Sequence, residues 1–329
     1  MKKFILSISL ILYMIGVQAQ NRKQIAGFTQ FKQFYNPSLT GYEGSVVRSL
    51  YRNQWTGFED APKTLLATGE IDVQMLGKRN NGYRFNGNGR DDLEVGAKHA
   101  LGLTLLYDQF GPSKESQVGL SYGSGIRLSE GLRMRWGTAL TYRMQRLDGS
   151  SLTVDQENDP RYTEVLGNSN RSGSMDLNIG LALTAARYYI GYGMQDVTAG
   201  SVVSTGDDFL NEMYTRKHVV QAGYRANITG QFGFTLNGIY QYDSLLKSTV
   251  EGQVKAVYQN MFWVGGGYRN DQAYNLGAGL NLDQLYIGYA YETPFQEARA
   301  INKATNEITL AYKLLSGKSK RQSEQPLLW

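Results

Sequence analysis

The sequence contains no cysteine, and proline and histidine are rare, at 6 and 2 of its 329 residues. The absence of cysteine excludes disulfide frameworks, thiolate catalysis, cysteine-ligated zinc, iron–sulfur clusters and a lipid anchor on an N-terminal cysteine. Beyond the N-terminal region no apolar run approaches the length of about twenty residues that a membrane-spanning helix needs, and the mean hydropathy is -0.39. The chain is therefore not expected to be a helical membrane protein.

Glycine and tyrosine, by contrast, are abundant, at 38 and 23 residues, which suits long β-strands and aromatic girdles. The clearest regular pattern runs from Val118 to Met144. From Leu132 onward apolar and aromatic residues recur at every second position, and the positions between them include Arg133, Arg135 and Arg143. The Ser129-Glu130-Gly131 turn reverses the chain. The stretch predicts a hairpin long enough to cross a bilayer, with Trp136 and Tyr142 toward lipid and the three arginines toward the lumen.

The same alternation recurs along the chain and predicts about fourteen strands. Most connections are long, but tight turns are expected near Glu130, Ala186, Gly230, Asn260 and Asp283. Short periplasmic turns and longer outer loops are typical of bacterial outer-membrane barrels, in which closure removes the unpaired strand edges. We therefore predict an all-β fold, a transmembrane outer-membrane antiparallel β-barrel of about 14 strands. A soluble sandwich or propeller is the alternative, and the long Gly77–Val95 connection on the periplasmic side departs from the pattern.

The chain divides into four predicted segments. Lys2 and Lys3 precede an apolar run from Phe4 to Val17, which predicts a secretory signal peptide over residues 1–19 and export from the cytoplasm. An uncleaved anchor is the alternative, although the run is short for a spanning helix. Residues 20–44 show no strand period and are expected to form a periplasmic or lumen-entering segment. The barrel is expected over residues 45–315, followed by a polar, basic tail over residues 316–329.

Charged residues fall on the inward face of several predicted strands. We expect them to form a luminal ion network in which Glu70 and Asp72 pair with arginines; its candidate members are Arg48, Arg52, Glu70, Asp72, Arg133, Arg135 and Arg143. The acidic pairs Asp91-Asp92 and Asp207-Asp208 fall in loops, where solvated charge is the simpler interpretation. The net charge of +5, spread over loops and alternate strand positions, gives no reason to expect nucleic acid as a partner.

Catalytic chemistry finds little support in the sequence. His218 is expected near the outer rim, where a lipid hydrolase could place its base, but no serine or acid partner is evident nearby. His99 is expected at a strand start near the periplasmic rim. The glycines Gly265 to Gly267 lie inside a strand without a following helix or lysine, so they do not indicate a phosphate loop. We expect no catalytic residues, no cofactor and no metal.

Several short motifs, in a fixed order, resemble one family. The stretch from Phe34 to Thr64 contains Asn36, Pro37, Gly41, Arg52, Gln54, Trp55, Gly57, Pro62 and Thr64, and later motifs contain Tyr268, Arg269 and Glu307. Leu101 to Pro112 and Ile287 to Glu292 extend the likeness. In these motifs the sequence resembles the PorP/SprF family of type IX secretion system outer-membrane proteins. It departs from the family at Glu292, where aspartate is usual, and at Asn306, which precedes Glu307 where histidine is common.

The resemblance implies a non-enzymatic role in protein secretion and gliding motility in Bacteroidota. The implied partners are outer-membrane lipid, components of the secretion machinery, and a large secreted adhesin whose C-terminal sorting domain the barrel would recognise. The Asn36-Pro37 pair is expected to turn the chain into the first strand, and Trp55 to join the aromatic girdle. A solute porin or transporter is the alternative function, and an outer-membrane hydrolase is a further one.

Overall fold

A computed structural model describes residues 24–74, 96–148, 170–201, 203–206, 215–244, 248–295 and 302–314. Several predictions lie outside these residues. They concern the signal peptide, the Gly77–Val95 loop, both loop acidic pairs, and the tail after residue 315. Among the described residues, no helix is long and apolar enough to cross a membrane.

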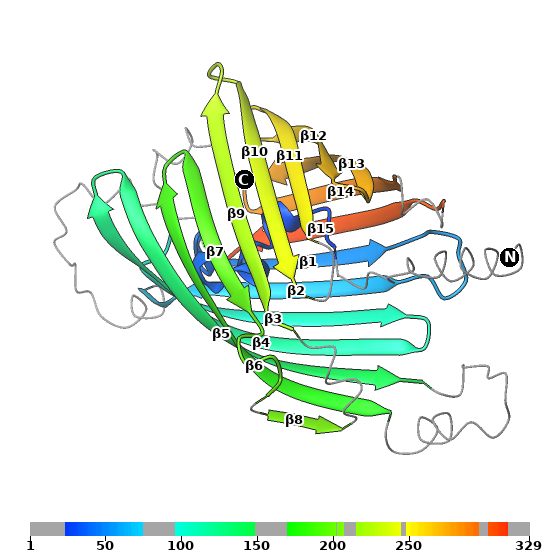
Figure 1. The fold of residues 1–329 in the computed structure, drawn as a ribbon. Coiled ribbons are helices and arrows are strands. Elements are labelled where there is room, and N and C mark those ends of the chain that lie inside the picture. Colours follow the sequence, from blue (N-terminus) through cyan, green and yellow to red (C-terminus); the bar gives the residue numbers. More distant parts are fainter. Residues whose placement is uncertain are drawn as a thin grey trace, which may run out of the picture.

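Fourteen antiparallel strands pair with their neighbours around a complete ring, which confirms the predicted barrel. The ring closes because β1 pairs with β15 and β5 pairs with β6. A fifteenth strand, β8 (Val203–Gly206), pairs with β6 alone, beyond the end of β7 (Figure 1). The barrel strands are β1 (Val46–Asn53), β2 (Lys63–Asp72), β3 (His99–Phe110), β4 (Ser113–Ser129), β5 (Leu132–Leu147), β6 (Arg171–Ala185), β7 (Tyr188–Gln195), β9 (Lys217–Asn227), β10 (Phe232–Asp243), β11 (Thr249–Tyr258), β12 (Phe262–Arg269), β13 (Ala273–Leu282), β14 (Leu285–Pro294) and β15 (Thr305–Lys313).

The two ends of the barrel differ. At one end, here called the turn end, tight turns join β4 to β5, β6 to β7, β9 to β10, β11 to β12 and β13 to β14, and these are the five turns that the alternation predicts. The first residue of β1 pairs with the last residue of β15, so the barrel's first strand begins and its last strand ends at the turn end. The connection from β2 to β3 also starts and ends at the turn end. The remaining connections lie at the opposite end, here called the loop end. Two of them are also short, at Gly111-Pro112 and at Asn270 to Gln272.

The two faces of the wall follow the alternation of the sequence. Trp136 and Tyr142 are 41% and 45% exposed on the outside, as predicted, whereas Arg135 on the same strand is fully buried inside. Large apolar side chains cover the outer face, as expected for a surface that contacts lipid. Both histidines join aromatic neighbours on this wall: the Nδ1 atoms of His99 and His218 each lie 2.7 Å from a tyrosine hydroxyl, that of Tyr122 and of Tyr192.

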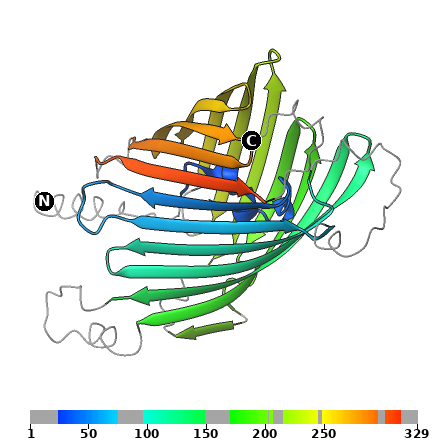
Figure 2. The same ribbon diagram turned by 180° about the vertical axis from the view of Figure 1, so that it is seen from behind.

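The barrel interior contains the chain's own N-terminal segment, residues 24–44, which we call the plug (Figures 1 and 2). It includes three short helices, η1 (Phe28–Gln30), α2 (Lys32–Tyr35) and η2 (Pro37–Leu39). Its apolar side chains pack on the wall in separate groups; for example, Ile25 and Phe31 contact Leu50, Leu66 and Leu106. The segment runs from Ala26, bonded near the loop end of β15, to Gly41, beside the start of β3. It then turns into β1 at the turn end.

Candidate functional site in the barrel lumen

One side of the lumen binds the plug through charge. On the inner face of β1, β11, β12, β14 and β15, five side chains form one cluster: Arg52, Glu251, Arg269, Glu292 and Glu307. Arg52 bridges Glu292 at 2.8 Å and Glu307 at 3.2 Å, while Arg269 bridges Glu292 at 3.2 Å and Glu251 at 2.8 Å. We call this set the carboxylate–arginine cluster.

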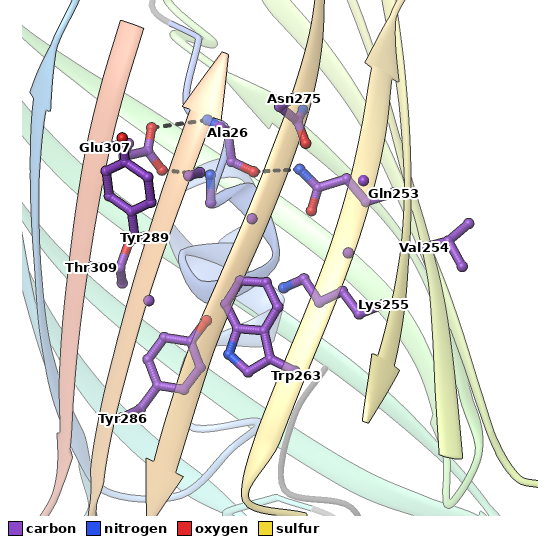
Figure 3. A pocket seen from close by; sticks show the side chains of 16 residues that line it. Ala26, Gln253, Val254, Lys255, Trp263, Asn275, Tyr286, Tyr289, Glu307 and Thr309 are labelled. Carbon is purple, nitrogen blue, oxygen red and sulfur yellow. Dashed lines mark hydrogen bonds between the residues drawn. The ribbon is translucent and has the colours of Figure 1, made fainter. Parts of the chain in front are cut away.

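The cluster has three carboxylates for two guanidinium groups, and the plug supplies further donors. The Glu307 carboxylate accepts from the backbone N–H of Ala26 at 3.0 Å and of Gly27 at 2.6 Å (Figure 3). Hydrogen bonds to an ionised acceptor are about twice as strong as neutral ones. The side-chain amide of Gln253 donates to the Ala26 carbonyl, so the start of the plug is held through both its donors and its acceptor.

A small cavity lies beside this contact. It encloses about 30 Å³, room for one or two water molecules, between the plug and the inner face of β11 to β15 (Figure 3). Trp263 and Tyr286 lie side by side along it with nearly parallel rings. The Lys255 ammonium lies 4.7 Å from the Trp263 ring centroid and donates to the Thr29 hydroxyl at 2.6 Å. The cavity is too small for an organic substrate, and its lining serves to position the plug.

Nearer the turn end, a second charged group fastens the end of the plug. Glu43 contacts both Lys32 of the plug and Arg48 of β1, and Arg48 also contacts Glu70 of β2. Burial acts to raise the pKa of Glu43, but the nearby Lys32 and Arg48 outweigh it and lower that pKa to about 2. The other oxygen of Glu70 accepts from the Gly41 backbone N–H at 2.6 Å.

Arg135 binds the plug in a different way. Its guanidinium donates to three backbone carbonyls, those of Ser38 at 2.9 Å, Ala97 at 2.8 Å and Thr40 at 2.7 Å. Ser38 and Thr40 belong to the plug, and Ala97 precedes β3. The rigid fork of an arginine suits such a task, since its five N–H donors lie in one plane.

The opposite side of the lumen receives the plug on glycine. Four inward glycines stand opposite one another in register across four strands, and we call them the glycine row: Gly123, Gly137, Gly180 and Gly193. A Cβ atom on Gly123 would lie 2.6 Å from the Thr40 carbonyl oxygen, and one on Gly193 would lie 2.8 Å from the Tyr35 carbonyl oxygen. Cβ atoms on Gly137 and Gly180 would overlap Pro37 and Asn36. The row therefore forms a smooth seat on which the plug backbone lies directly.

Asn36 and Pro37 lie in this seat, which corrects the expectation that they turn the chain into the first strand. Asn36 is fully buried, caps η2 by accepting from the Ser38 N–H at 3.0 Å, and donates to the Leu181 carbonyl at 3.4 Å. Pro37 occupies the first position of η2, where its missing N–H costs nothing. The pair thus shapes the plug inside the barrel.

The predicted ion network differs from the observed contacts in several partners. Arg48 contacts Glu70, but Arg52 pairs with Glu292 and Glu307 and does not contact Glu70 or Asp72. Asp72 instead accepts from the Gln74 N–H in the turn that follows β2. Arg133 donates to the Gly96 carbonyl. Near the loop end, Arg143 pairs with Glu115 and with Asp196, which also binds Lys217.

The family-motif residues fall in three places. Asn36, Pro37 and Gly41 belong to the plug, and Arg52, Arg269 and Glu307 meet in the carboxylate–arginine cluster. The others lie toward the loop end: Gln54, Trp55, Gly57 and Pro62 between β1 and β2, Thr64 in β2, and Tyr268 on the outer face of β12. Trp55 contacts Phe58 and Phe110 edge-on at 6.3 and 5.5 Å. These aromatic contacts lie at the loop-end rim.

Three features of the lumen are missing from the sequence expectations: Glu251 and Glu292 as arginine partners, Lys255 beside Trp263, and the glycine row. Glu251 and Glu292 stand at inward positions of strands with a clear two-residue period, so the sequence indicates that both side chains point into the lumen. The sequence signal for the glycine row is weaker: glycines recur at inward positions of β4 to β7. In the described residues neither histidine is bonded to a carboxylate, so the arrangement of a catalytic triad is not present there.

Comparison with protein-family models matches residues 17–312 to the family described as type IX secretion system membrane protein PorP/SprF. No curated protein sequence matches the chain. Among solved structures, the chain is similar to the CymD monoaromatic hydrocarbon channel, with 10% identity and a TM-score of 0.47 over 90% of this chain and 93% of that one. A Pseudomonas aeruginosa FadL homologue matches with 8% identity and a TM-score of 0.43, over 86% and 93%. Acinetobacter baumannii Omp33 matches with 8% identity and a TM-score of 0.41, over 82% and 96%.

Proposed function

Because the chain belongs to the PorP/SprF family of type IX secretion system membrane proteins, we propose that it acts as a sealed outer-membrane barrel that binds protein partners and catalyses no reaction. The observation that carries this proposal is the plug. A segment of the chain itself occupies the lumen, and its bonds to the wall are numerous and buried. A barrel filled in this way has its outer surfaces, and not its bore, as working parts.

We assign the turn end to the periplasm and the loop end to the cell surface. Short turns on the periplasmic side and longer loops outside are the rule for outer-membrane barrels. The first and last strands both meet the turn end, which agrees with this orientation. In this orientation, components of the secretion machinery would bind at the turn end. The loop end would meet exported cargo, such as the C-terminal sorting domain of a large adhesin.

The main alternative is a porin or transporter for small solutes. It requires a continuous water-filled path, whereas the plug lies in the lumen on a seat of backbone-to-backbone contact. The distinguishing measurement is single-channel conductance of the purified protein in planar bilayers. We expect negligible conductance, and a stable, ion-selective channel in the wild-type protein would contradict a sealed barrel.

The secretion role is tested in cells that lack the gene. We expect the mutant to retain type IX cargo inside the cell, as measured by mass spectrometry of the culture medium, and the wild-type gene to restore its release. A His218→Ala variant should restore release equally well, because among the described residues the side chain of His218 contacts two tyrosines of the barrel wall and no acid or serine. Unchanged secretion in the deletion strain would contradict the role, and failure of His218→Ala alone would favour an outer-membrane hydrolase.

A further inference from the structure

The connection between β1 and β2 contains several of the family-motif residues and projects at the loop end (Figure 1). Backbone bonds fix its shape: the Gln54 N–H donates to the Pro62 carbonyl at 2.9 Å, and the Gly111 N–H donates to the Asp60 carbonyl at 3.2 Å. Trp55 and Asp60 have left-handed backbone conformations, with φ of 51° and 54°, which are uncommon for residues other than glycine. Conformations of this kind are concentrated at functional sites, so the connection is a place to look for one.

A pocket of about 260 Å³ lies between this connection and the ends of three strands. One of its walls is a row of side chains on β1, β2 and β3, in which Asn53 stands opposite Lys63 and Lys63 stands opposite Gln109. The connection supplies the remaining lining residues, Gly57, Phe58, Asp60 and Ala61. The volume is just below the range of about 300–1,000 Å³ for pockets that hold drug-sized ligands, so this pocket suits a smaller group.

The polar side chains of the pocket carry balanced charge and mixed hydrogen-bonding groups. Asp60 brings an acceptor, Lys63 brings donors, and the amides of Asn53 and Gln109 bring both. The Gln109 oxygen accepts from the Tyr107 hydroxyl at 3.3 Å, which leaves the amide N–H groups of Gln109 for a ligand. Because the lining has one acid and one base, it gives no net attraction for an anion or a cation. Hydroxyl groups, which both donate and accept, match this lining.

An aromatic ring borders the same pocket. Phe58 is 49% exposed, although its ring also contacts Trp55 edge-on at 6.3 Å. An exposed ring offers an apolar surface on which the C–H face of a sugar can pack. A ring beside hydroxyl-binding side chains therefore favours a sugar over other small polar groups.

The pocket lies on the outer face of the barrel at the level of lipid head groups. Tyr51 and Tyr107, which precede Asn53 and Gln109 by two residues on the same face, are 45% and 41% exposed. Such aromatic girdles mark the boundary between hydrocarbon and head groups around outer-membrane barrels. A group in the pocket would therefore lie beside the head groups and outside the lumen.

We propose that this pocket binds the uncharged sugar head group of a glycolipid. The proposal goes beyond the proposed function and depends on it only for the leaflet, because the loop end is assigned there to the cell surface. Phe58 would pack on the sugar ring, and the polar side chains would bond to its hydroxyl groups. The acyl chains would lie along the apolar outer face nearer the barrel centre, where Leu65 is 49% exposed.

The test uses the full chain in a polyoxyethylene detergent, which contains no sugar, and counts bound lipids by native mass spectrometry. The probe is monoglucosyldiacylglycerol, compared with phosphatidylglycerol and phosphatidylethanolamine that carry the same acyl chains. We expect the glycolipid to bind about tenfold more tightly than either phospholipid, and F58A to remove this preference. The matched control is F262A, which removes a ring of similar exposure, 48%, from the outer face at the turn end. It should bind as the wild type does.

The outcomes separate the proposal from its alternatives. Equal or tighter binding of either phospholipid would overturn it, and so would an unchanged preference in F58A. Displacement of the glycolipid by an equal concentration of methyl glucoside would overturn the lipid source, in favour of a free sugar. If F58A does not fold, N53A/Q109A, which removes both amides, decides in the same way. These measurements do not involve secretion, so their failure refutes the sugar site alone and leaves the secretion role to the deletion strain.

Discussion

The plug meets two walls that hold it by opposite means. Toward β4 to β7 the plug backbone lies directly on glycine, and Arg135 binds it from beside the glycine row. Toward β1 and β11 to β15 the wall presents long side chains: the Glu307 carboxylate accepts from two N–H groups of the plug, and the Gln253 amide donates to a plug carbonyl. The glycine side depends on the absence of side chains at the four positions of the glycine row, and this absence fixes how closely the plug backbone approaches the wall. The charged side depends on long side chains, and it holds the start of the plug through bonds to Glu307 and Gln253.

The largest effect is expected from filling the glycine side. In a G137V/G180V variant the added side chains would overlap the backbone of Pro37 and the side chain of Asn36, and rotation of a side chain cannot relieve contact with backbone. We expect the plug to leave its seat and ion conductance to appear in planar bilayers. The control is G69V/G252V, in which an added Cβ would meet nothing within 4 Å. If G137V/G180V forms an intact barrel and shows no conductance, the glycine row is not needed to seat the plug.

A smaller effect is expected from the charged side. Glu307→Gln removes the charge that Arg52 faces at 3.2 Å and weakens the bonds from Ala26 and Gly27. Loss of one partner of a buried ion pair costs about 3–5 kcal/mol. Because Arg52 keeps its bond to Glu292, we expect the cost here at the lower end of this range. We expect this decrease in the free energy of unfolding, measured in urea with the protein in lipid. The R52M/E307L double variant should recover part of it, and additive losses would show that the two residues do not act as a pair.

The smallest effect is expected from acid, at the turn end of the charged side. The pKa of Glu43 is about 2 in the folded protein, below the value of about 4.3 usual for a free glutamate. Its stabilising contribution is therefore complete above about pH 4.3 and is lost as the pH falls toward 2, by up to about 3 kcal/mol. We expect unfolding midpoints to fall more steeply over this range in the wild type than in a Glu43→Gln variant. Equal slopes in the two proteins would exclude Glu43 as the source.

The barrel itself was predictable because it depends on a local rule. A strand with one face in lipid must alternate, so Trp136, Tyr142 and Arg135 could be placed on their faces from spacing alone. The five tight turns followed from the same alternation. No comparison with another chain was needed for these conclusions.

The contents of the lumen were less predictable, because they depend on closure. Arg52 was assigned to Glu70 and Asp72, which lie near it in sequence, but closure of the ring brings β14 and β15 beside β1. Its true partners, Glu292 and Glu307, are more than two hundred residues away in the chain. The role of the glycine row is hard to read from the sequence for a related reason. A glycine inside a strand has no outward sign of what it makes room for, and the plug has no period that would indicate a partner.

The pair of Arg52 and Glu307 also bears on how the molecule is assembled. These two residues are register partners on the first and last strands of the ring, and the same glutamate receives the start of the plug. Pairing of β1 with β15 therefore places the ion pair that closes the barrel beside the hydrogen bonds that hold the plug. A chain that closed before its N-terminal segment had entered would bury a carboxylate without two of its donors. A barrel closed around an empty lumen would therefore be less stable than the filled one, by the two bonds that Glu307 accepts from the plug.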